Sequence, residues 1–242
     1  MRVINNVIVA AVLVLSLNSC FVRTNGLSSN VVFYHSDSTK VIDRVEEPFT
    51  SLEVSSGMDV QFIPSTEYRV VAEVPKNTQY LFSTAVYEDG KLMIKTDEAS
   101  IIDVRTEKTR IEFRDFPPIK VYCPYLTAVK INGSGDFRAD DLTVTGEFKA
   151  EIYGSGDIEI KNLVSDDCSL SIFGAGDIEV KNIDVHDLKA SLFGAGDIDI
   201  AGKAESADLD IHGAGDIDIR NLNVSGNVKT DCRGVGSVKM KK

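Results

Sequence analysis

The chain has 242 residues, a formal net charge of −11 from 26 Lys and Arg against 37 Asp and Glu, and an apolar fraction of 43%. These values predict one folded domain, or at most two, and they argue against a disordered, collagen-like or coiled-coil protein. The acidic balance also argues against a nucleic-acid partner, because proteins that neutralise phosphates need a basic stripe.

Residues 1–20 are predicted to be a lipoprotein signal peptide. Arg2 precedes a short apolar run from Val7 to Leu17, and a run of this length is too short to span a bilayer. The segment Leu17-Asn18-Ser19-Cys20 resembles the bacterial lipobox, with Asn18 in place of the commoner small residue. This resemblance implies lipid chains on Cys20 that hold the protein on a membrane. Ordinary secretory cleavage is the alternative.

A lipid on Cys20 would anchor the chain in the cell envelope of a Gram-negative bacterium, at the outer membrane. The residues that follow, Phe21-Val22-Arg23, lack the acidic cluster that resembles a surface-export signal of some lipoproteins. The sequence therefore leaves open whether the protein faces the outside or the periplasm.

Residues 48–240 are predicted to form one continuous β-helical domain, after a tether over residues 21–47 with little periodicity. Near its start, residues 49–62 resemble a degenerate copy of residues 126–137, with Gly57 at the corner. The segments that follow alternate like strands but have poor turn signals, so we expect irregular coils in this half.

A four-residue motif, Gly-Ser/Ala-Gly-Asp, recurs through residues 126–240. Its first glycines are 21, 20, 20, 19 and 21 residues apart. The copies begin at Gly133, Gly154, Gly174, Gly194 and Gly213, and a degenerate copy begins at Gly234. A period this short, without helix signals, indicates a β-type repeat.

Apolar and polar residues alternate on both sides of the motif, as in Leu188-Lys189-Ala190-Ser191-Leu192, which predicts strands. Identical positions of successive repeats must stack, because one repeat cannot bury its apolar face alone. We therefore predict an all-β fold, a parallel and right-handed β-helix with one coil per repeat and about three short strands per coil. The rival is a β-sandwich, which would give turn signals every 8–12 residues.

The lipobox-like Cys20, the Phe-x-x-Leu-x-Val opening at Phe49, the passage at residues 124–136 and the serial Gly-Ser/Ala-Gly-Asp corners occur together. In this combination the chain resembles the family of putative auto-transporter adhesins with a head GIN domain. The resemblance covers about residues 48–237. It implies a secreted or lipid-anchored bacterial protein with a β-helical body, and it supplies no catalytic residue.

The aspartates of the motif are predicted to form an outward column, and a second acidic column lies beside it. The first column contains Asp136, Asp157, Asp177, Asp197 and Asp216, and the second contains Glu159, Glu179, Asp199 and Asp218. Stacked carboxylates about 4.8 Å apart repel one another unless they are hydrogen-bonded or neutralised. We favour hydrogen bonds to turn amides for the first column, and partial neutralisation by Lys161, Lys181 and Arg220 for the second.

Two other interpretations of these columns are a row of Ca²⁺ sites and the carboxylates of a polysaccharide-active enzyme. A column of equivalent acids does not distinguish a general acid from a base. We therefore predict no catalytic residue and no cofactor, with Ca²⁺ on the first column as the alternative.

Strand parity also places Tyr153, Phe173 and Phe193 on the outside, as a stripe that could contact a partner. A corner position could equally tuck these rings over the core. Secretion would permit disulfides, but we interpret Cys168 and Cys232 as inward-facing core residues. The histidines, His35, His186 and His212, share no spacing with other metal ligands and are interpreted as surface residues.

These observations favour a lipid-anchored, non-catalytic envelope protein that binds through a repetitive surface, as an adhesin does. The alternative is a structural lipoprotein that faces the periplasm, and a polysaccharide-active enzyme is the third. The partners that this interpretation implies are a membrane, through the lipid, and a glycan or a protein, with a second copy of the chain as a further alternative.

Overall fold

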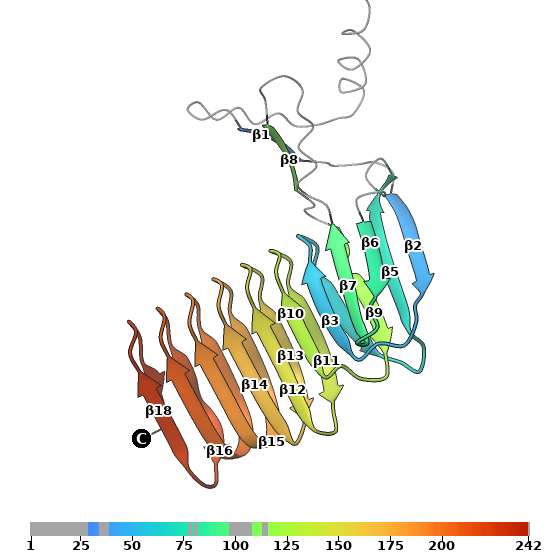
Figure 1. Cartoon of the computed structure of the whole chain (residues 1–242). Helices are drawn as coiled ribbons and strands as arrows, with labels where there is room; N and C mark the ends of the chain where they lie inside the picture. The colour runs from blue at the N-terminus through green and yellow to red at the C-terminus, as the bar shows by residue number, and fades with distance from the viewer. Residues whose placement is uncertain are drawn as a thin grey trace, which may run out of the picture.

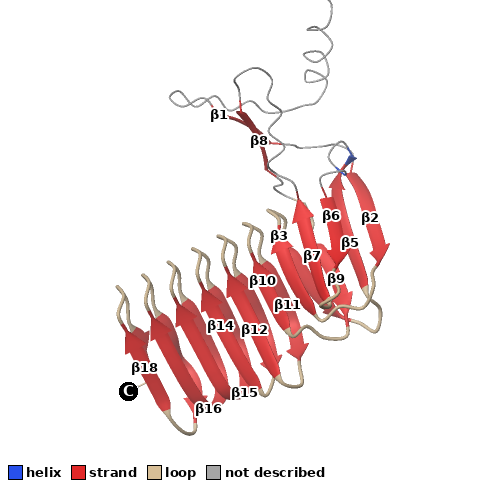
Figure 2. Ribbon diagram, in the orientation of Figure 1, coloured by secondary structure: helices blue, strands red, loops and turns tan. Residues whose placement is uncertain are grey.

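The computed structural model describes residues 29–33, 39–76, 79, 82–96, 108–112 and 116–241. These residues form a nearly all-β protein without an α-helix. In the same ranges we find no helix with the length and apolar character needed to cross a membrane. The parallel strands lie side by side along one axis and turn the chain into a solenoid (Figures 1 and 2). The predicted all-β solenoid is therefore confirmed.

The regular part of the solenoid contains ten strands in chain order. These are β10 (Ala128–Ile131), β11 (Phe137–Thr143), β12 (Glu147–Ile152), β13 (Ile158–Val164), β14 (Asp167–Ile172), β15 (Ile178–Leu192), β16 (Ile198–Ile211), β17 (Ile217–Val224), β18 (Val228–Cys232) and β19 (Val238–Lys239). Each pairs in parallel with the equivalent strand of the next repeat, so that Ile158 lies beside Ile178, and Ile178 beside Ile198.

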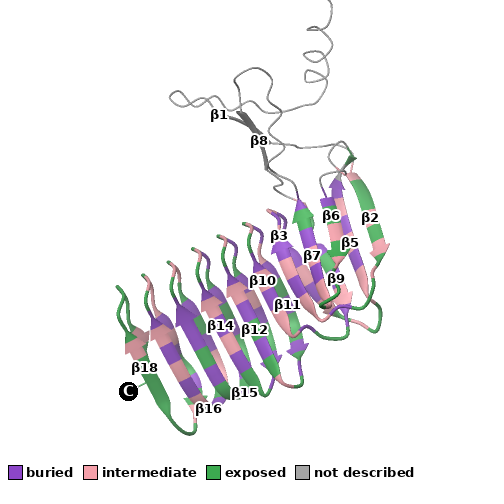
Figure 3. Ribbon diagram, in the orientation of Figure 1, coloured by how far each residue is buried: buried purple, intermediate pink, exposed green. Residues whose placement is uncertain are grey.

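The core runs along the solenoid axis as stacked columns of apolar side chains. Ile131 and Ile152 form one such column before the glycine corner, and Ile158, Ile178 and Ile198 form another after it, all at most 1% exposed. Buried and exposed positions alternate along the strands, as Figure 3 shows by colour. The inward positions predicted from the alternation are confirmed for these columns.

The coils contain fewer strands than the three predicted. The burial pattern does have three inward segments per coil, but β15 continues through two of the three corners without interruption. At one of these corners Lys181 and Asn182 are both exposed. Two successive outward residues change the parity of the strand, so the chain bends around the core. Asn182 still pairs with Asn162 of the preceding coil, whereas the register with β16 shifts between Val180 and Ile183.

The corner glycines are required by close contact between coils. A Cβ on Gly174 would lie 2.0 Å from the carbonyl oxygen of Gly154 in the preceding coil, and equivalent overlaps occur at the other corners. Among the described corner glycines, only Gly196 and Gly215 have a positive φ. Most corner glycines are therefore required for the close approach of the coils and not for a left-handed backbone conformation.

The first half of the chain adds irregular coils that stack out of chain order. Strand β3 (Ser51–Ser55) pairs in parallel with β10, and β4 (Val60–Pro64) pairs in parallel with β11, as expected for a degenerate copy of the repeat. On their other side they pair in parallel with β7 (Lys91–Thr96) and β9 (Ile119–Cys123). The coil that comes first in the chain is thus sandwiched between two later ones.

Antiparallel strands cover this end of the solenoid. Strand β6 (Phe82–Val86) pairs with β7, while β5 (Arg69–Pro75) pairs with β9 and with β2 (Thr39–Val45). Because β2 lies within residues 21–47, the prediction of a tether is wrong for its C-terminal part. A separate two-stranded parallel sheet joins β1 (Ser29–Phe33) to β8 (Lys108–Glu112).

The last coil has no further coil over it among the described residues. Cys232 pairs in register with the buried Ile211, yet it is exposed, because no residue packs on its free side. The interpretation of Cys232 as a core residue is therefore wrong. Cys123 and Cys168 are buried, and burial raises the pKa of the Cys123 thiol to about 12 and that of the Cys168 thiol further.

Candidate functional site

The corner aspartates form a ladder of hydrogen bonds between coils. The Oδ1 atom of Asp157 accepts a hydrogen bond from the backbone N–H of Asp177 at 2.8 Å, and Oδ1 of Asp177 accepts one from the N–H of Asp197 at 2.7 Å. The same bond recurs along the column from Asp59 to Ser237. The amide partner predicted for these carboxylates exists, but it belongs to the next coil rather than to the aspartate's own turn.

Cations close this ladder at both ends. Arg138 binds Asp59 and Asp136 at one end, with N–O distances of 2.8 Å to each. Lys239 lies 2.7 Å from Asp216 at the other end, and its hydrogen bond, together with those from Ser237, lowers the pKa of the Asp216 carboxyl. The three aspartates between them have no ion pair among the described residues. The ladder is therefore held by amide hydrogen bonds along its length.

The second acidic column is unevenly neutralised. Arg220 binds both carboxylate oxygens of Asp218 and lowers its pKa. Lys181 pairs with Glu159, which lowers the pKa of that carboxyl, and lies 3.6 Å from Glu179. Asp199 forms no ion pair in the part of the chain that the structure describes. Partial desolvation of this carboxyl raises its pKa, and the neighbouring charges, Asp218 first among them, raise it further.

Lys161 does not neutralise this column by a direct contact. Its Nζ lies 2.6 Å from a carboxylate oxygen of Asp140, on the preceding coil. Of the three cations expected beside the second column, Lys181 and Arg220 therefore contact it, and Lys161 acts on it without an ion pair, since its charge contributes to the lowered pKa of Glu159.

The aromatic stripe lies on the outer surface. Tyr153, Phe173 and Phe193 are 46%, 41% and 46% exposed. The rings of Tyr153 and Phe173 are stacked with centroids 4.6 Å apart, and those of Phe173 and Phe193 with centroids 5.1 Å apart. The outward interpretation of the strand parity is correct at these positions, and a role of the stripe in binding stays a prediction.

The ends of this stack are also covered. Nζ of Lys130 lies 4.4 Å from the centroid of the Tyr153 ring, and the His212 ring lies against Phe193 with centroids 5.4 Å apart. Sugars stack on the faces of aromatic rings, but here the faces contact one another and only the edges meet solvent. The stripe is therefore a poor platform for a sugar ring.

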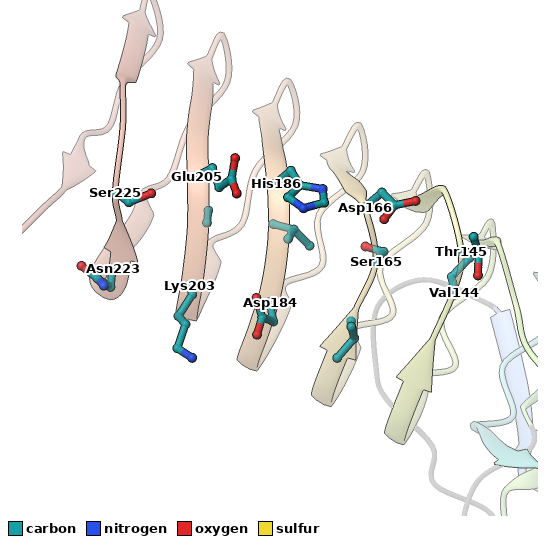
Figure 4. A pocket seen from close by; sticks show the side chains of 13 residues that line it. Val144, Thr145, Ser165, Asp166, Asp184, His186, Lys203, Glu205, Asn223 and Ser225 are labelled. Carbon is teal, nitrogen blue, oxygen red and sulfur yellow. The ribbon is translucent and has the colours of Figure 1, made fainter.

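A groove of about 490 Å³ crosses five successive coils on another side of the solenoid. Its buried floor includes Val144, Ser165, Val185 and Ala204. One wall is the row Val164, Asp184, Lys203 and Asn223, which lie side by side in the strand register. The other wall is the row Thr145, Asp166, His186, Glu205 and Ser225, and Figure 4 shows both rows along the coils. With coils about 4.8 Å apart, the groove is about 20 Å long.

The charged side chains of the groove are free for a ligand. In the described ranges, Asp184, Lys203 and Glu205 form no ion pair with each other or with other residues, and all three are exposed. Asp166 uses one oxygen to accept a hydrogen bond from the Gly146 N–H at 2.8 Å. The groove therefore offers carboxylates, an ammonium, an imidazole and hydroxyls along an apolar floor, with an excess of negative charge.

This groove is not predicted by the repeat pattern, because its walls consist of positions that do not repeat. The wall residues differ from coil to coil, and their column becomes visible only when the coils are aligned. Variable polar residues at one position of an otherwise strict repeat are the signal that could have found it. Of the other predicted residues, His186 and His212 are exposed as expected, while Cys20 and His35 lie outside the described residues.

Comparisons with known proteins agree with this fold. The family described as putative auto-transporter adhesin, head GIN domain, matches residues 48–241. The chain is similar to the crystal structure of a putative adhesin from Bacteroides fragilis, with 22% identity and a TM-score of 0.63 over 84% of this chain and 97% of that one. The search of curated proteins gave no match.

Two further solved structures come from Parabacteroides distasonis. A putative adhesin is 17% identical, with a TM-score of 0.52 over 87% of this chain and 100% of that one. A putative lipid binding protein is 18% identical, with a TM-score of 0.51 over 88% of this chain and 100% of that one. At these identities the structures support the fold of the chain.

Proposed function

Because the chain belongs to the family of putative auto-transporter adhesins with a head GIN domain, we propose that it is a non-catalytic, adhesin-like protein of the bacterial cell envelope that binds an extended ligand in the groove. The observation that carries this proposal is the groove itself. It is long, it is open at the surface, and its charged side chains are unpaired.

The groove favours a linear, hydroxyl-rich and uncharged ligand, such as a neutral polysaccharide. The backbones of its coils are already paired with one another, so a peptide cannot add a strand there and must rely on side-chain contacts. The excess of carboxylates, with Asp184 and Glu205 unpaired against Lys203, disfavours a polyanion. The charged walls also disfavour an acyl chain.

A non-catalytic role fits the state of the acidic columns. The corner aspartates already accept amide hydrogen bonds, and Asp218 is held by Arg220 through both oxygens. A glycosidase needs two carboxylates free to contact the glycosidic bond from opposite sides. These contacts support a binding protein over a polysaccharide-active enzyme.

The test of the binding proposal is an array of immobilised neutral and anionic polysaccharides and matrix proteins. We expect the wild-type chain to bind at least one neutral polysaccharide, and the groove variant Glu205→Lys to lose that binding at least tenfold. Glu147→Lys makes the same exchange on an exposed side chain outside the groove and should bind as the wild type does. Equal losses in both variants, or binding to anionic polymers alone, would overturn the proposal.

We further propose that lipid chains on Cys20 hold the protein at the outer membrane. The support for this is the apolar segment and the lipobox-like sequence of residues 1–20. Labelling of cells with a radioactive fatty acid tests the anchor, and Cys20→Ser should remove the label. An unlabelled wild-type chain would favour ordinary secretory cleavage.

The side of the membrane decides between an adhesin and a structural lipoprotein of the periplasm. Protease treatment of intact cells, with a periplasmic protein as the lysis control, measures this directly. Loss of the protein from intact cells is the result expected for an adhesin. Digestion only after permeabilisation would place the domain in the periplasm and favour the structural role.

A further inference from the structure

We propose that Asp210, His212 and Asp231 form a binding site for Zn²⁺ or a similar divalent transition metal on the outer surface of β16 and β18. One potential ligand atom of each side chain lies within 4.8 Å of the ligand atoms of the other two. The site is separate from the groove, and the inference does not depend on the proposed function.

The strand geometry brings these three residues together. Asp210 and His212 are two positions apart and therefore project from the same side of β16, His212 being the first residue after the strand. Asp231 is paired directly with Asp210 in the parallel register of β16 and β18. The Phe193 ring packs against the imidazole of His212 and limits its orientation.

The residue types of the repeat change at the metal-ligand positions, in the column that contains Asp210 and in the column that contains His212. The positions equivalent to Asp210 in the two preceding coils are Ser171 and Ser191, and those equivalent to His212 are Phe173 and Phe193. A solenoid that only continued its stack would repeat serine beside an aromatic ring. Instead, two carboxylates and an imidazole replace them together, which is the kind of donor set that binds zinc.

The charges at this place also leave room for a cation. The side chain of Asp210 forms no ion pair or hydrogen bond among the described residues, and the equally charged Asp231 lies on the adjacent strand. Arg233 pairs with Asp231 at 2.7 Å, and Lys229 pairs with Asp208 instead of Asp210. A bound cation would relieve the repulsion between the two aspartates.

The donor set favours a transition metal over Ca²⁺ or Mg²⁺. Those hard cations prefer oxygen ligands, whereas imidazole nitrogen suits zinc. Zinc ligands lie about 2.0–2.2 Å from the metal, so neighbouring ligand atoms are roughly 3.3 Å apart. The three ligand atoms already lie within 4.8 Å of one another, so rotation of the side chains would bring them toward that spacing, and water would complete the coordination.

Isothermal titration calorimetry tests the site on the full chain, purified without a histidine tag and stripped of metal with a chelator. We expect one Zn²⁺ per chain with micromolar affinity, and no comparable binding of Ca²⁺. His212→Asn, Asp210→Asn and Asp231→Asn should each weaken binding at least tenfold. Circular dichroism spectra that match the wild type would show that these surface variants fold.

Three control variants separate this site from unspecific binding. His186→Asn removes the other described histidine and Cys232→Ser removes the one exposed thiol of the described residues, and neither should change the affinity for zinc. Arg233→Ala frees the carboxylate of Asp231, so it should tighten binding several-fold. Retention of zinc by His212→Asn, loss of zinc in either neutral control, or equal binding of Ca²⁺ would overturn the proposal.

Discussion

At the scale of single residues, the corner glycines set how closely two coils can approach. A side chain at Gly174 would overlap the carbonyl oxygen of Gly154, and this backbone oxygen cannot turn away. The coils would have to separate locally, with loss of the hydrogen bonds that join them.

We therefore predict that Gly174→Ala lowers the free energy of unfolding by about 3 kcal/mol. Ala175→Ser is the matched control in the same turn, because the equivalent positions hold Ser134 and Ser155, and it should change stability by less than about 0.5 kcal/mol. Urea denaturation followed by circular dichroism measures both. Equal stability of the two variants would mean that the coils are further apart than described.

Each corner aspartate also stabilises the stack of coils, through a hydrogen bond to a single carboxylate oxygen. Asp177→Ala removes the acceptor for the Asp197 N–H and should lower the free energy of unfolding by about 1 kcal/mol. The effect stays small because this amide is exposed and water can replace the lost acceptor. Asp177→Asn keeps a carbonyl oxygen for the amide and removes one charge from the acidic column. We expect thermal melts at low salt to show a clear loss for alanine and little or none for asparagine.

The same contacts bear on the alternative that the column binds Ca²⁺, which stays a prediction. In these aspartates Oδ1 already accepts an amide hydrogen bond, which leaves one oxygen of each for a calcium ion. We therefore expect melting in excess Ca²⁺ to coincide with melting in EDTA. A higher melting temperature in Ca²⁺ that is lost in Asp177→Asn would favour calcium sites.

At the scale of strands, neighbouring members of one column have opposite electrostatic environments. The pKa of Asp199 on β16 is raised, chiefly by partial desolvation and then by the charge of Asp218. The pKa of Asp218 on β17 is lowered, chiefly by its hydrogen bonds to Arg220. A raised pKa means that the ionised carboxylate destabilises the folded state, and a lowered pKa means that it stabilises it.

These signs predict opposite responses to pH. Asp199→Asn should raise the melting temperature at pH 7, and this gain should vanish as the pH falls below the ordinary aspartate value of about 3.9. Asp218→Asn should lower the melting temperature at pH 7, and this loss should shrink as the pH falls through the lowered pKa of Asp218. Melts from pH 2 to 8 at low ionic strength check both, and a shift of the same sign in the two variants would contradict the assignment.

The strands that repeat could be predicted from the sequence, because their evidence is local. The alternation of apolar and polar residues around the glycine motif predicts the inward columns, and the fixed period of the motif predicts the parallel stacking. The number of strands could not be obtained in this way, since a two-residue change of parity such as Lys181-Asn182 looks like a turn although the strand continues through it. The groove was missed for a related reason, because it consists of the positions that vary.

At the scale of the whole molecule, the order of stacking in the first half could not be predicted. The pairing of β3 with both β7 and β10 joins segments far apart in the chain, and no local pattern encodes which of them lies between the others. The metal-ligand group was hidden for the same reason, because Asp231 reaches Asp210 only through the register of two coils. Long-range register is the information that one sequence lacks.

The two ends of the solenoid differ in a way that should govern its unfolding. The first coils are covered by the antiparallel strands β2, β5 and β6, whereas the last coil, with β18, is exposed over most of its residues. In a stack where each coil contacts only its neighbours, a coil with one neighbour is held by half as many interfaces as a coil with two. The last coil should therefore open first.

Hydrogen exchange followed by mass spectrometry tests this expectation along the chain. We predict fast exchange for the amides of residues 226–239, intermediate exchange for residues 198–224, and the slowest exchange for residues 128–192. Asp216 pairs with Lys239 across the last interface, so Lys239→Glu should speed exchange in the last coil and leave residues 128–192 unchanged. Uniformly slow exchange to residue 239 would instead mean that another surface, such as a second copy of the chain, covers this end in solution.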